Sequence, residues 1–370
     1  MATPVDPRPA RLAAVRERMG TAGVDTLLLS LGADLPWLIG YRAMPLERLT
    51  MLVVPLEGDP ILVVPQLEVP RVEPAPELFA VRAWGETEDP IEIVTGVIGR
   101  SRRRLAVSTR AWAAAVLALQ ATLPRATWTT ASTVTAPLRA VKDAAEVDAL
   151  RHAAAAADRV AATLVSGDIP LLGRTEAEVS RELSKRLVAE GHDSVNFAIV
   201  ASGPNSASPH HEPGRRRIEA GEAVVCDFGG TMAGYCSDIT RTIFTGTPPA
   251  AFVDLYAVLY TAQAAAVDAA RTGMSCHDVD AVARDIITDA GFGPQFLHRT
   301  GHGIGLEEHE DPYLVAGNRQ RLVPGHTFSI EPGIYDAGHW GARIEDIVVA
   351  TEAGPDPLNR ADHALAVVET

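Results

Sequence analysis

The chain has 370 residues, of which 47% are apolar, so it is long enough for two domains with cores of their own, and a disordered or fibrous protein is excluded. Its formal net charge of −14 excludes the basic surface that nucleic-acid binding requires, and no face rich in lysine and arginine suits an anionic membrane. The partners that remain are small molecules and further copies of the same chain.

Segments that would direct the chain out of the cytoplasm are not found in the sequence. Residues 1–20 lack the apolar core of a secretory signal, and the apolar run WAAAVLALQATL, which begins at Trp112, is too short to span a bilayer. Cys226, Cys236 and Cys276 form no CxxC pair, which predicts free, buried thiols in a reducing compartment. We therefore expect a soluble, cytoplasmic protein.

The first part of the chain alternates short β-branched runs with helical patterns. Runs beginning near residues 25, 50, 60 and 104 predict strands, and a helix is expected from Arg110 to Ala121. Gly58, Asp59 and Pro60 separate two apolar runs, which predicts two strands joined by a turn. These patterns predict an α/β domain over residues 1–141.

From residue 142 onward the pattern changes to a long alanine-rich helix, so a second domain is predicted over 142–370. The same order of secondary-structure elements, two helices followed by a strand, occurs twice in this domain. Two helices ending near Gly167 and at Gly191 precede the strand AVVCDFGG, and two helices ending near Gly273 and at Gly291 precede the strand HTFSIEPG. We predict an internal duplication, and the alternative is a chance alignment of alanine-rich helices.

Each half of this repeat supplies two carboxylates. Asp227 and Glu331 lie in the two apolar strands, while Asp238 and Glu345 each follow a glycine-containing hairpin. An acid within a buried strand needs a partner, and the partner we expect is a cation. Oxygen ligands on adjacent strands can converge on such a cation.

The stretch TGHGIGLEEHE, residues 300–310, adds an imidazole to these acids. Its glycines fit neither the dinucleotide fingerprint nor a phosphate loop, and the zinc-protease pattern HExxH is absent. What remains is His302, placed between glycines that let the backbone approach closely. One imidazole and four carboxylates suit one or two divalent ions such as Mn, Co, Fe or Zn. Two such ions can activate water and polarise a carbonyl, which is the chemistry of metal-assisted amide hydrolysis.

Five segments resemble those of the pita-bread metallopeptidase superfamily, which includes Xaa-Pro aminopeptidases, prolidases and methionine aminopeptidases. They are IVASGPNSASPHHEP from 199, VVCDFGGTMAGYCSDITRT from 224, HRTGHGIGLEEHEDPY from 298, FSIEPGIY from 328 and RIEDIVV from 343. Within the superfamily the chain is similar to the prolidase-like bacterial Xaa-Pro dipeptidases. The first domain resembles the creatinase/prolidase N-terminal domain through its length and the segment DLPWLIGYR.

This resemblance implies an α+β second domain with a curved antiparallel sheet, flanking helices and a pseudo-two-fold repeat. It also implies five ligands for two metal ions, with Asp238 and Glu345 as the bridging ligands. The five are Asp227, Asp238, His302, Glu331 and Glu345.

The resemblance further assigns residues that would contact the substrate. His210, with His211 beside it as the alternative, and His309 would bind the scissile peptide and stabilise the tetrahedral intermediate. His298 aligns with a further active-site histidine of the proline-specific members. Glu331 is expected to shuttle the proton, and Arg343 to bind substrate or orient Glu345. The acidic run 307–311 is expected to be a solvated rim.

The predicted function is hydrolysis of Xaa-Pro dipeptides by a cytoplasmic homodimeric hydrolase with two divalent ions, manganese first and Co, Zn or Fe as alternatives. A dipeptidase needs a cation for the free carboxylate of its substrate, and Arg319 and Arg321 are the nearest candidates in sequence. If neither reaches the site, an Xaa-Pro aminopeptidase acting on longer peptides is the better interpretation. The same fold also admits a metal-free hydrolase or a binding module, and the intact ligand set argues against both.

Overall fold

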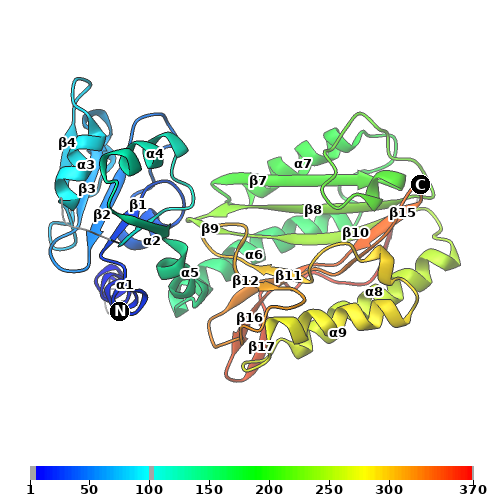
Figure 1. Ribbon diagram of the computed structural model, residues 1–370. Coiled ribbons are helices and arrows are strands. Elements are labelled where there is room, and N and C mark those ends of the chain that lie inside the picture. Colours follow the sequence, from blue (N-terminus) through cyan, green and yellow to red (C-terminus); the bar gives the residue numbers. More distant parts are fainter. Residues whose placement is uncertain (1–5, 100–103, 369–370) are drawn as a thin grey trace, which may run out of the picture. The chain divides into compact units, whose positions relative to one another are not determined.

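The computed structural model describes residues 6–99 and 104–368, and the chain divides into two compact units, Met1–Arg139 and Ala140–Thr370. Figure 1 shows the first unit in blue to cyan-green and the second in green to red.

The first unit contains a six-stranded sheet in the order β4-β3-β2-β1-β5-β6. The central strand β1 is antiparallel to β2 and parallel to β5, and β2 and β3 form an antiparallel pair. The strands are β1 (Thr26–Leu29), β2 (Met51–Pro55), β3 (Ile61–Pro65), β4 (Ala80–Trp84), β5 (Arg104–Val107) and β6 (Thr127–Thr130). The helices are α1 (Arg8–Ala22), α2 (Asp34–Ile39), the 3₁₀ helix η1 (Gln66–Arg71), α3 (Pro90–Ile98), α4 (Ala113–Thr122) and α5 (Ser132–Ala140).

The strands predicted near residues 25, 50, 60 and 104 are present in this unit, and one predicted helix boundary differs. The predicted turn joins β2 to β3, and Gly58 adopts a φ of 103°, which glycine tolerates best. Helix α4 begins at Ala113 rather than at Arg110. The reason is that Trp112 has extended backbone angles and its indole Nε1 donates to the carbonyl oxygen of Leu46 at 2.8 Å.

The second unit contains two sheets and a two-stranded hairpin. One sheet has the order β18-β10-β8-β7, with β9 paired to β8, and the other has the order β12-β11-β13-β16-β17. The first comprises β7 (Ser194–Ser202), β8 (Ala223–Met232), β9 (Tyr235–Cys236), β10 (Ile239–Thr245) and β18 (Ala366–Val368). The second comprises β11 (Gly301–Gly303), β12 (Glu310–Leu314), β13 (Thr327–Ile330), β16 (Asp346–Thr351) and β17 (Gly354–Pro357), and the hairpin comprises β14 (Gly333–Asp336) and β15 (Trp340–Arg343). A backbone bridge between Thr240 and Glu345 joins the two sheets.

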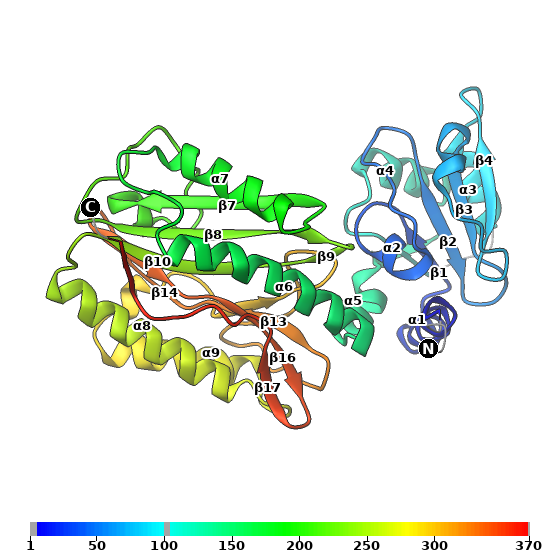
Figure 2. The ribbon, with the colours of Figure 1, turned by 180° about the vertical axis from the view of Figure 1, so that it is seen from behind.

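Two pairs of helices cover these sheets. Helices α6 (Ala144–Val165) and α7 (Glu176–Ala189) pack on β7, β8 and β10, and α8 (Ala250–Ala269) and α9 (Cys276–Asp289) pack on β12 and β13. Figures 1 and 2 show the two pairs flanking the strands. Short 3₁₀ helices, η2 (Gly203–Ala207) and η3 (Gly293–Gln295), follow β7 and α9.

The predicted order of elements recurs in the two halves of this unit, down to the contacts of single side chains. Thr175 caps α7 and Ser275 caps α9. Each cap forms a backbone bridge with an arginine, Arg217 in the first half and Arg321 in the second. Each of these arginines donates at 2.6 Å to the carbonyl oxygen of the glycine two residues before the cap. The two halves are therefore built in the same way.

Helix α8 is long and apolar enough to cross a membrane by length and composition alone. Its buried residues, which include Phe252, Leu255 and Leu259, pack into the same core cluster as Phe244 and Phe328. In this structure the apolar residues of α8 therefore contribute to the core of the second unit.

Candidate metal centre

A cavity of about 480 Å³ lies where the two sheets of the second unit meet. All five residues proposed from the sequence as metal ligands line it, and so do the three proposed active-site histidines and Arg343. Asp227 comes from β8, His302 from β11, and Asp238, Glu331 and Glu345 from positions just outside β10, β13 and β16. The other lining residues are Phe197, Ile199, Pro209, Arg299 and Glu308.

Glycines place His302 in this cavity by letting three strands come together. A Cβ atom on Gly301 would collide with the carbonyl oxygen of Ser329, and one on Gly303 with the carbonyl of Asp311. The His302 backbone N–H donates at 3.0 Å to Ser329 Oγ, which donates at 3.0 Å to Glu331 Oε1. The backbone of these glycines therefore lies close to neighbouring strands, as the sequence predicted for a close backbone approach. This packing places His302 beside Glu331.

The proposed ligand atoms lie close together. His302 Nε2 is 3.1 Å from Glu331 Oε1 and 3.8 Å from Asp238 Oδ2. One ligand atom each from Asp238, His302 and Glu345 lie within 4.8 Å of one another. His302 Nδ1 is 3.1 Å from the carbonyl oxygen of Gly303, which suits a proton on Nδ1, while Nε2 faces the acids and can bind a metal once it has no proton.

The electrostatics of the cavity fit a cation. In the described part of the chain, Asp227 Oδ1 and Asp238 Oδ1 are buried without a hydrogen-bond partner. Burial, and then the charges of Glu345 and Asp227, raise the pKa of Asp238 well above its usual value, and burial and Glu331 do the same for Glu345. Buried acids that repel one another and leave oxygens unpaired provide the donor set that one or two divalent ions prefer.

Glu331 differs from the other acids. Burial would raise its pKa, but the hydrogen bond and charge of His302 outweigh burial and lower the pKa of Glu331 to about 2. In the metal-free protein this carboxylate is therefore ionised at neutral pH, and an ionised carboxylate can accept a proton.

Arg343 lies behind the acids and contacts one of them, together with two hydroxyl groups that the sequence analysis did not single out. Its guanidinium donates to Asp227 Oδ2 at 2.5 Å, to Tyr335 Oη at 2.8 Å and to Thr240 Oγ1 at 3.1 Å. Thr240 Oγ1 donates in turn to Glu345 Oε2 at 2.6 Å. Arg343 thus contacts Asp227 directly and reaches Glu345 only through Thr240. The sequence signal for Tyr335 was its place in FSIEPGIY, two residues after Gly333.

The neighbouring histidines His210 and His211 have different surroundings. His210 lines the cavity, whereas His211 Nε2 lies 2.8 Å from Glu176 Oε2, a fully buried carboxylate. Glu176 also accepts from Ser202, at the end of β7. The pair therefore anchors the loop that carries His210, and His210 is the histidine available to a substrate.

The other two histidines have lowered pKa values. Desolvation against the cavity wall, and then the charges of His302 and Arg299, lower the pKa of His309 to about 4. Burial lowers the pKa of His298, whose Nε2 lies 2.8 Å from Tyr335 Oη. A neutral His309 can present a ring N–H to a developing negative charge at neutral pH.

Two expectations about charged residues are wrong. Neither Arg319 nor Arg321 lines the cavity: Arg319 is exposed near Asp278, and Arg321 serves the cap of α9. The acidic run 307–311 is not all a solvated rim, because Glu310 is buried against Lys142 Nζ at 2.6 Å and Glu308 lines the cavity. The Glu310–Lys142 pair fixes the strand that follows His309.

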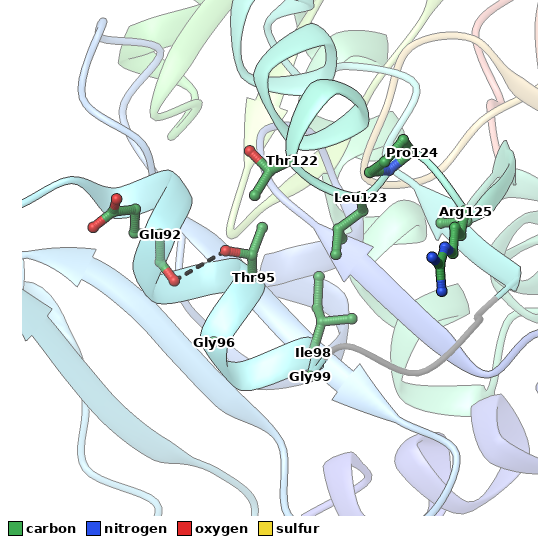
Figure 3. Close-up of a pocket in the computed structure, with 10 residues that line it drawn as sticks. Glu92, Thr95, Gly96, Ile98, Gly99, Thr122, Leu123, Pro124 and Arg125 are labelled. Atoms are coloured by element: carbon green, nitrogen blue, oxygen red, sulfur yellow. Dashed lines mark hydrogen bonds between the residues drawn. The ribbon is translucent and has the colours of Figure 1, made fainter.

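A larger cavity, of about 730 Å³, lies in the first unit and lacks comparable chemistry. Figure 3 shows Glu92 and Arg125, its ionisable lining residues, at opposite sides of the cavity. The Thr95 hydroxyl donates at 3.0 Å to the carbonyl oxygen of Glu92 within α3. The metal-binding geometry found among the described residues is confined to the second unit.

Residues 141–352 match the model of metallopeptidase family M24, and residues 11–141 match the creatinase/prolidase N-terminal domain. The chain is a member of metallopeptidase family M24. This M24 peptidase is 46% identical over 365 residues to a probable dipeptidase, PepE, of Mycobacterium tuberculosis, covering 97% of this chain and 96% of the relative. It is 34% identical to an Xaa-Pro dipeptidase of Lactobacillus helveticus, covering 93% of this chain and 95% of the relative.

The structure agrees with these relationships. A prolidase from Thermococcus sibiricus superposes with a TM-score of 0.93 at 34% identity, covering 99% of this chain and 100% of the prolidase. The family and the two-part fold class predicted from the sequence are confirmed. The M24 peptidase is therefore a hydrolase of the metallopeptidase class.

Proposed function

We propose that this M24 peptidase hydrolyses Xaa-Pro dipeptides with two divalent metal ions. The observation that carries the proposal is the convergence of one imidazole and four carboxylates, two of them with unpaired buried oxygens, in a cavity of about 480 Å³. That volume suits a small ligand. The dipeptidase and Xaa-Pro dipeptidase names of the relatives support the same substrate class. The residues that would hold the ions are Asp227, Asp238, His302, Glu331 and Glu345.

The metal ions, when bound, supply an activated water and polarise the scissile carbonyl. Side chains of the protein are proposed to transfer the proton of the attacking water and to stabilise the negative charge of the tetrahedral intermediate. Glu331, ionised at neutral pH, is placed to accept the proton of the attacking water and to pass it to the proline nitrogen as that nitrogen leaves. The leaving nitrogen needs this proton because an unprotonated amide nitrogen would leave as a strongly basic anion, and the nitrogen of an Xaa-Pro bond carries no hydrogen of its own.

The histidines act on the oxygen of the tetrahedral intermediate and on the orientation of the peptide. His309 lies beside the ligand set, with its ring centroid 4.0 Å from that of His302, and its neutral ring can donate to the oxyanion. His210 and His298 line the same cavity and are proposed to contact the peptide. Manganese is the proposed metal, since a carboxylate-rich donor set favours it, with Co, Zn or Fe as alternatives.

The test is hydrolysis of Ala-Pro, Leu-Pro, Ala-Pro-Ala and Met-Ala-Ala by metal-stripped protein, before and after addition of Mn or Co. We expect metal-restored cleavage of the two Xaa-Pro dipeptides. Asp238→Ala should abolish it, while Asp254→Ala, which removes an exposed acid on α8, should not. Preferred cleavage of Ala-Pro-Ala would assign an Xaa-Pro aminopeptidase instead. No metal-dependent turnover of any peptide would exclude a peptidase of this specificity.

A further inference from the structure

We propose that Arg299 binds the free C-terminal carboxylate of the substrate and thereby makes the site selective for dipeptides. This inference rests on the proposed Xaa-Pro hydrolysis and names the residue that sets peptide length. It replaces the two arginines suggested by the sequence, which do not line the cavity.

Two arginines line the cavity, and only one is available for a substrate. The guanidinium of Arg343 is buried and committed to Asp227, Tyr335 and Thr240. Arg299 is half-buried, and within residues 6–99 and 104–368 its guanidinium has neither a hydrogen bond nor an acid within ion-pair distance. A partly desolvated guanidinium without an anion is a ready partner for a carboxylate, which it can bind through two parallel hydrogen bonds.

The backbone of Arg299 is fixed on both sides. His298, the residue before it, is held through its carbonyl oxygen by Arg284 at 2.8 Å and through its ring by Tyr335. Thr300, the residue after it, donates from its backbone N–H and its hydroxyl to the buried Asp280 at 3.0 and 2.8 Å. The backbone from which the Arg299 side chain starts is thus held by hydrogen bonds of both neighbouring residues.

The guanidinium is also held in place by an aromatic ring. Arg299 Cζ lies 4.4 Å from the ring centroid of Tyr313, within the range of a cation–π contact. Tyr313 is the direct cross-strand partner of His302, and its carbonyl oxygen accepts from Asn318 at 2.7 Å. Within the described residues no hydrogen bond occupies the N–H groups of this guanidinium, so they can donate to a ligand. Arg299 lines the same cavity as the proposed ligands and His309.

The chemistry of the substrate explains why this cation favours dipeptides. In an Xaa-Pro dipeptide only the proline nitrogen and Cα separate the scissile carbon from the carboxylate carbon, a path of about 4 Å. In a longer peptide a neutral amide occupies that place. Glu308, which is not a proposed metal ligand, lines the same cavity and would repel a free carboxylate. Arg299 supplies the opposite charge on this chain.

The test compares Ala-Pro with its C-terminal amide, which lacks only the negative charge, on wild type and on Arg299→Gln, Arg299→Lys and Arg319→Gln. Wild type should favour Ala-Pro over the amide by about tenfold to a hundredfold in kcat/KM, the value of a charged hydrogen-bonded pair. Arg299→Gln should lose that preference through a higher KM for Ala-Pro alone, with the amide unaffected. Arg299→Lys should keep part of the preference for Ala-Pro over its amide. Arg319→Gln, which changes an exposed side chain outside the cavity, should keep the full preference.

A second readout avoids turnover. Calorimetric titration of L-proline into the metal-loaded protein should show binding that weakens about tenfold or more in Arg299→Gln, whereas L-prolinamide should bind both proteins alike. Thermal unfolding checks that the variant is folded.

The outcomes separate this inference from the proposed function. Equal hydrolysis of Ala-Pro and its amide by wild type would overturn the role of Arg299 and leave Xaa-Pro hydrolysis standing. An equal loss on both substrates in Arg299→Gln would also overturn it and assign Arg299 a structural role, for example beside Glu308. Failure of wild type to cleave either compound with metal present would reject the proposed function, and the inference with it.

Discussion

The hydroxyl of Thr240 lies between two charged side chains of the metal centre. It donates to Glu345 and accepts from Arg343, and Arg343 in turn donates to Asp227. A single buried hydroxyl therefore connects an acid of the first sheet to an acid of the second. Groups in this position orient metal ligands without touching the metal.

We expect Thr240→Val to weaken metal binding by about tenfold to a hundredfold while leaving the fold intact. Valine has the shape of threonine and suits a strand, but it leaves Glu345 Oε2 without its donor. Metal titration of the stripped protein, with a competing chelator, measures the effect. Thr240→Ser, which keeps the hydroxyl, is the matched control and should bind metal nearly as wild type does. Equal affinity of the two variants would show that this hydrogen bond does not position Glu345.

Some residues of this site could be predicted from the sequence and others only from the structure, for a physical reason. Asp227 and Glu331 could be predicted, since a charged group in an apolar strand needs a partner wherever the strand lies. Thr240 and Arg299 could not, because a hydroxyl or an arginine near a strand end is ordinary until the topology shows what faces it. Arg321 was predicted to bind the substrate carboxylate because it lies near the active-site motifs in sequence. The structure shows instead that it contacts the cap of α9, as Arg217 contacts the cap of α7 in the first half of the repeat.

At the scale of elements, the short strand β11 lies between β12 and β13, and its first and last residues are glycines. The order of the elements and their recurrence could be read from helix periodicity and glycine positions, because both reflect local geometry. The pairing of β11 with β12 and β13 could not be predicted, because a strand of three residues has too short a hydrophobic pattern to indicate its neighbours.

We predict that Gly303→Ala lowers the free energy of unfolding by about 1–3 kcal/mol or more and also weakens metal binding. The added methyl group would meet the backbone of Glu310 and Asp311, which cannot move away without shifting β12 and His302. Urea unfolding and metal titration measure the two effects. Gly214→Ala is the control within the same unit, because its Cβ would have ordinary contacts only, the nearest at 3.7 Å, and we expect a change below about 0.5 kcal/mol. Wild-type metal affinity in Gly303→Ala would refute the link between strand spacing and His302.

At the scale of the whole molecule, the buried acids make stability depend on pH and metal together. In the metal-free protein, burial and neighbouring acids raise the pKa values of Asp238 and Glu345. A carboxyl group whose folded pKa exceeds its unfolded value, near 4, stabilises the fold below that value, and this contribution is lost as the pH rises through the folded pKa. This contribution to the stability of the metal-free protein should therefore decrease as the pH rises above about 4.

Metal ions bind the ionised carboxylates, so their affinity rises over the same range and stabilises the native state by mass action. We accordingly expect the difference in Tm between protein with excess Mn and protein with chelator to widen from about pH 5.5 to about pH 8. The titration of His326 does not change this difference in Tm between the two forms. Burial, and then Lys142, lower the pKa of His326 to about 4, so its contribution is lost as pH falls from about 6.5 toward 4 in both forms alike. Calorimetric scans at both pH values make the measurement, and Asp238→Asn, with one buried acid fewer, should narrow the difference. A difference in Tm that stays constant with pH in wild type would mean that the acids do not exchange protons for metal.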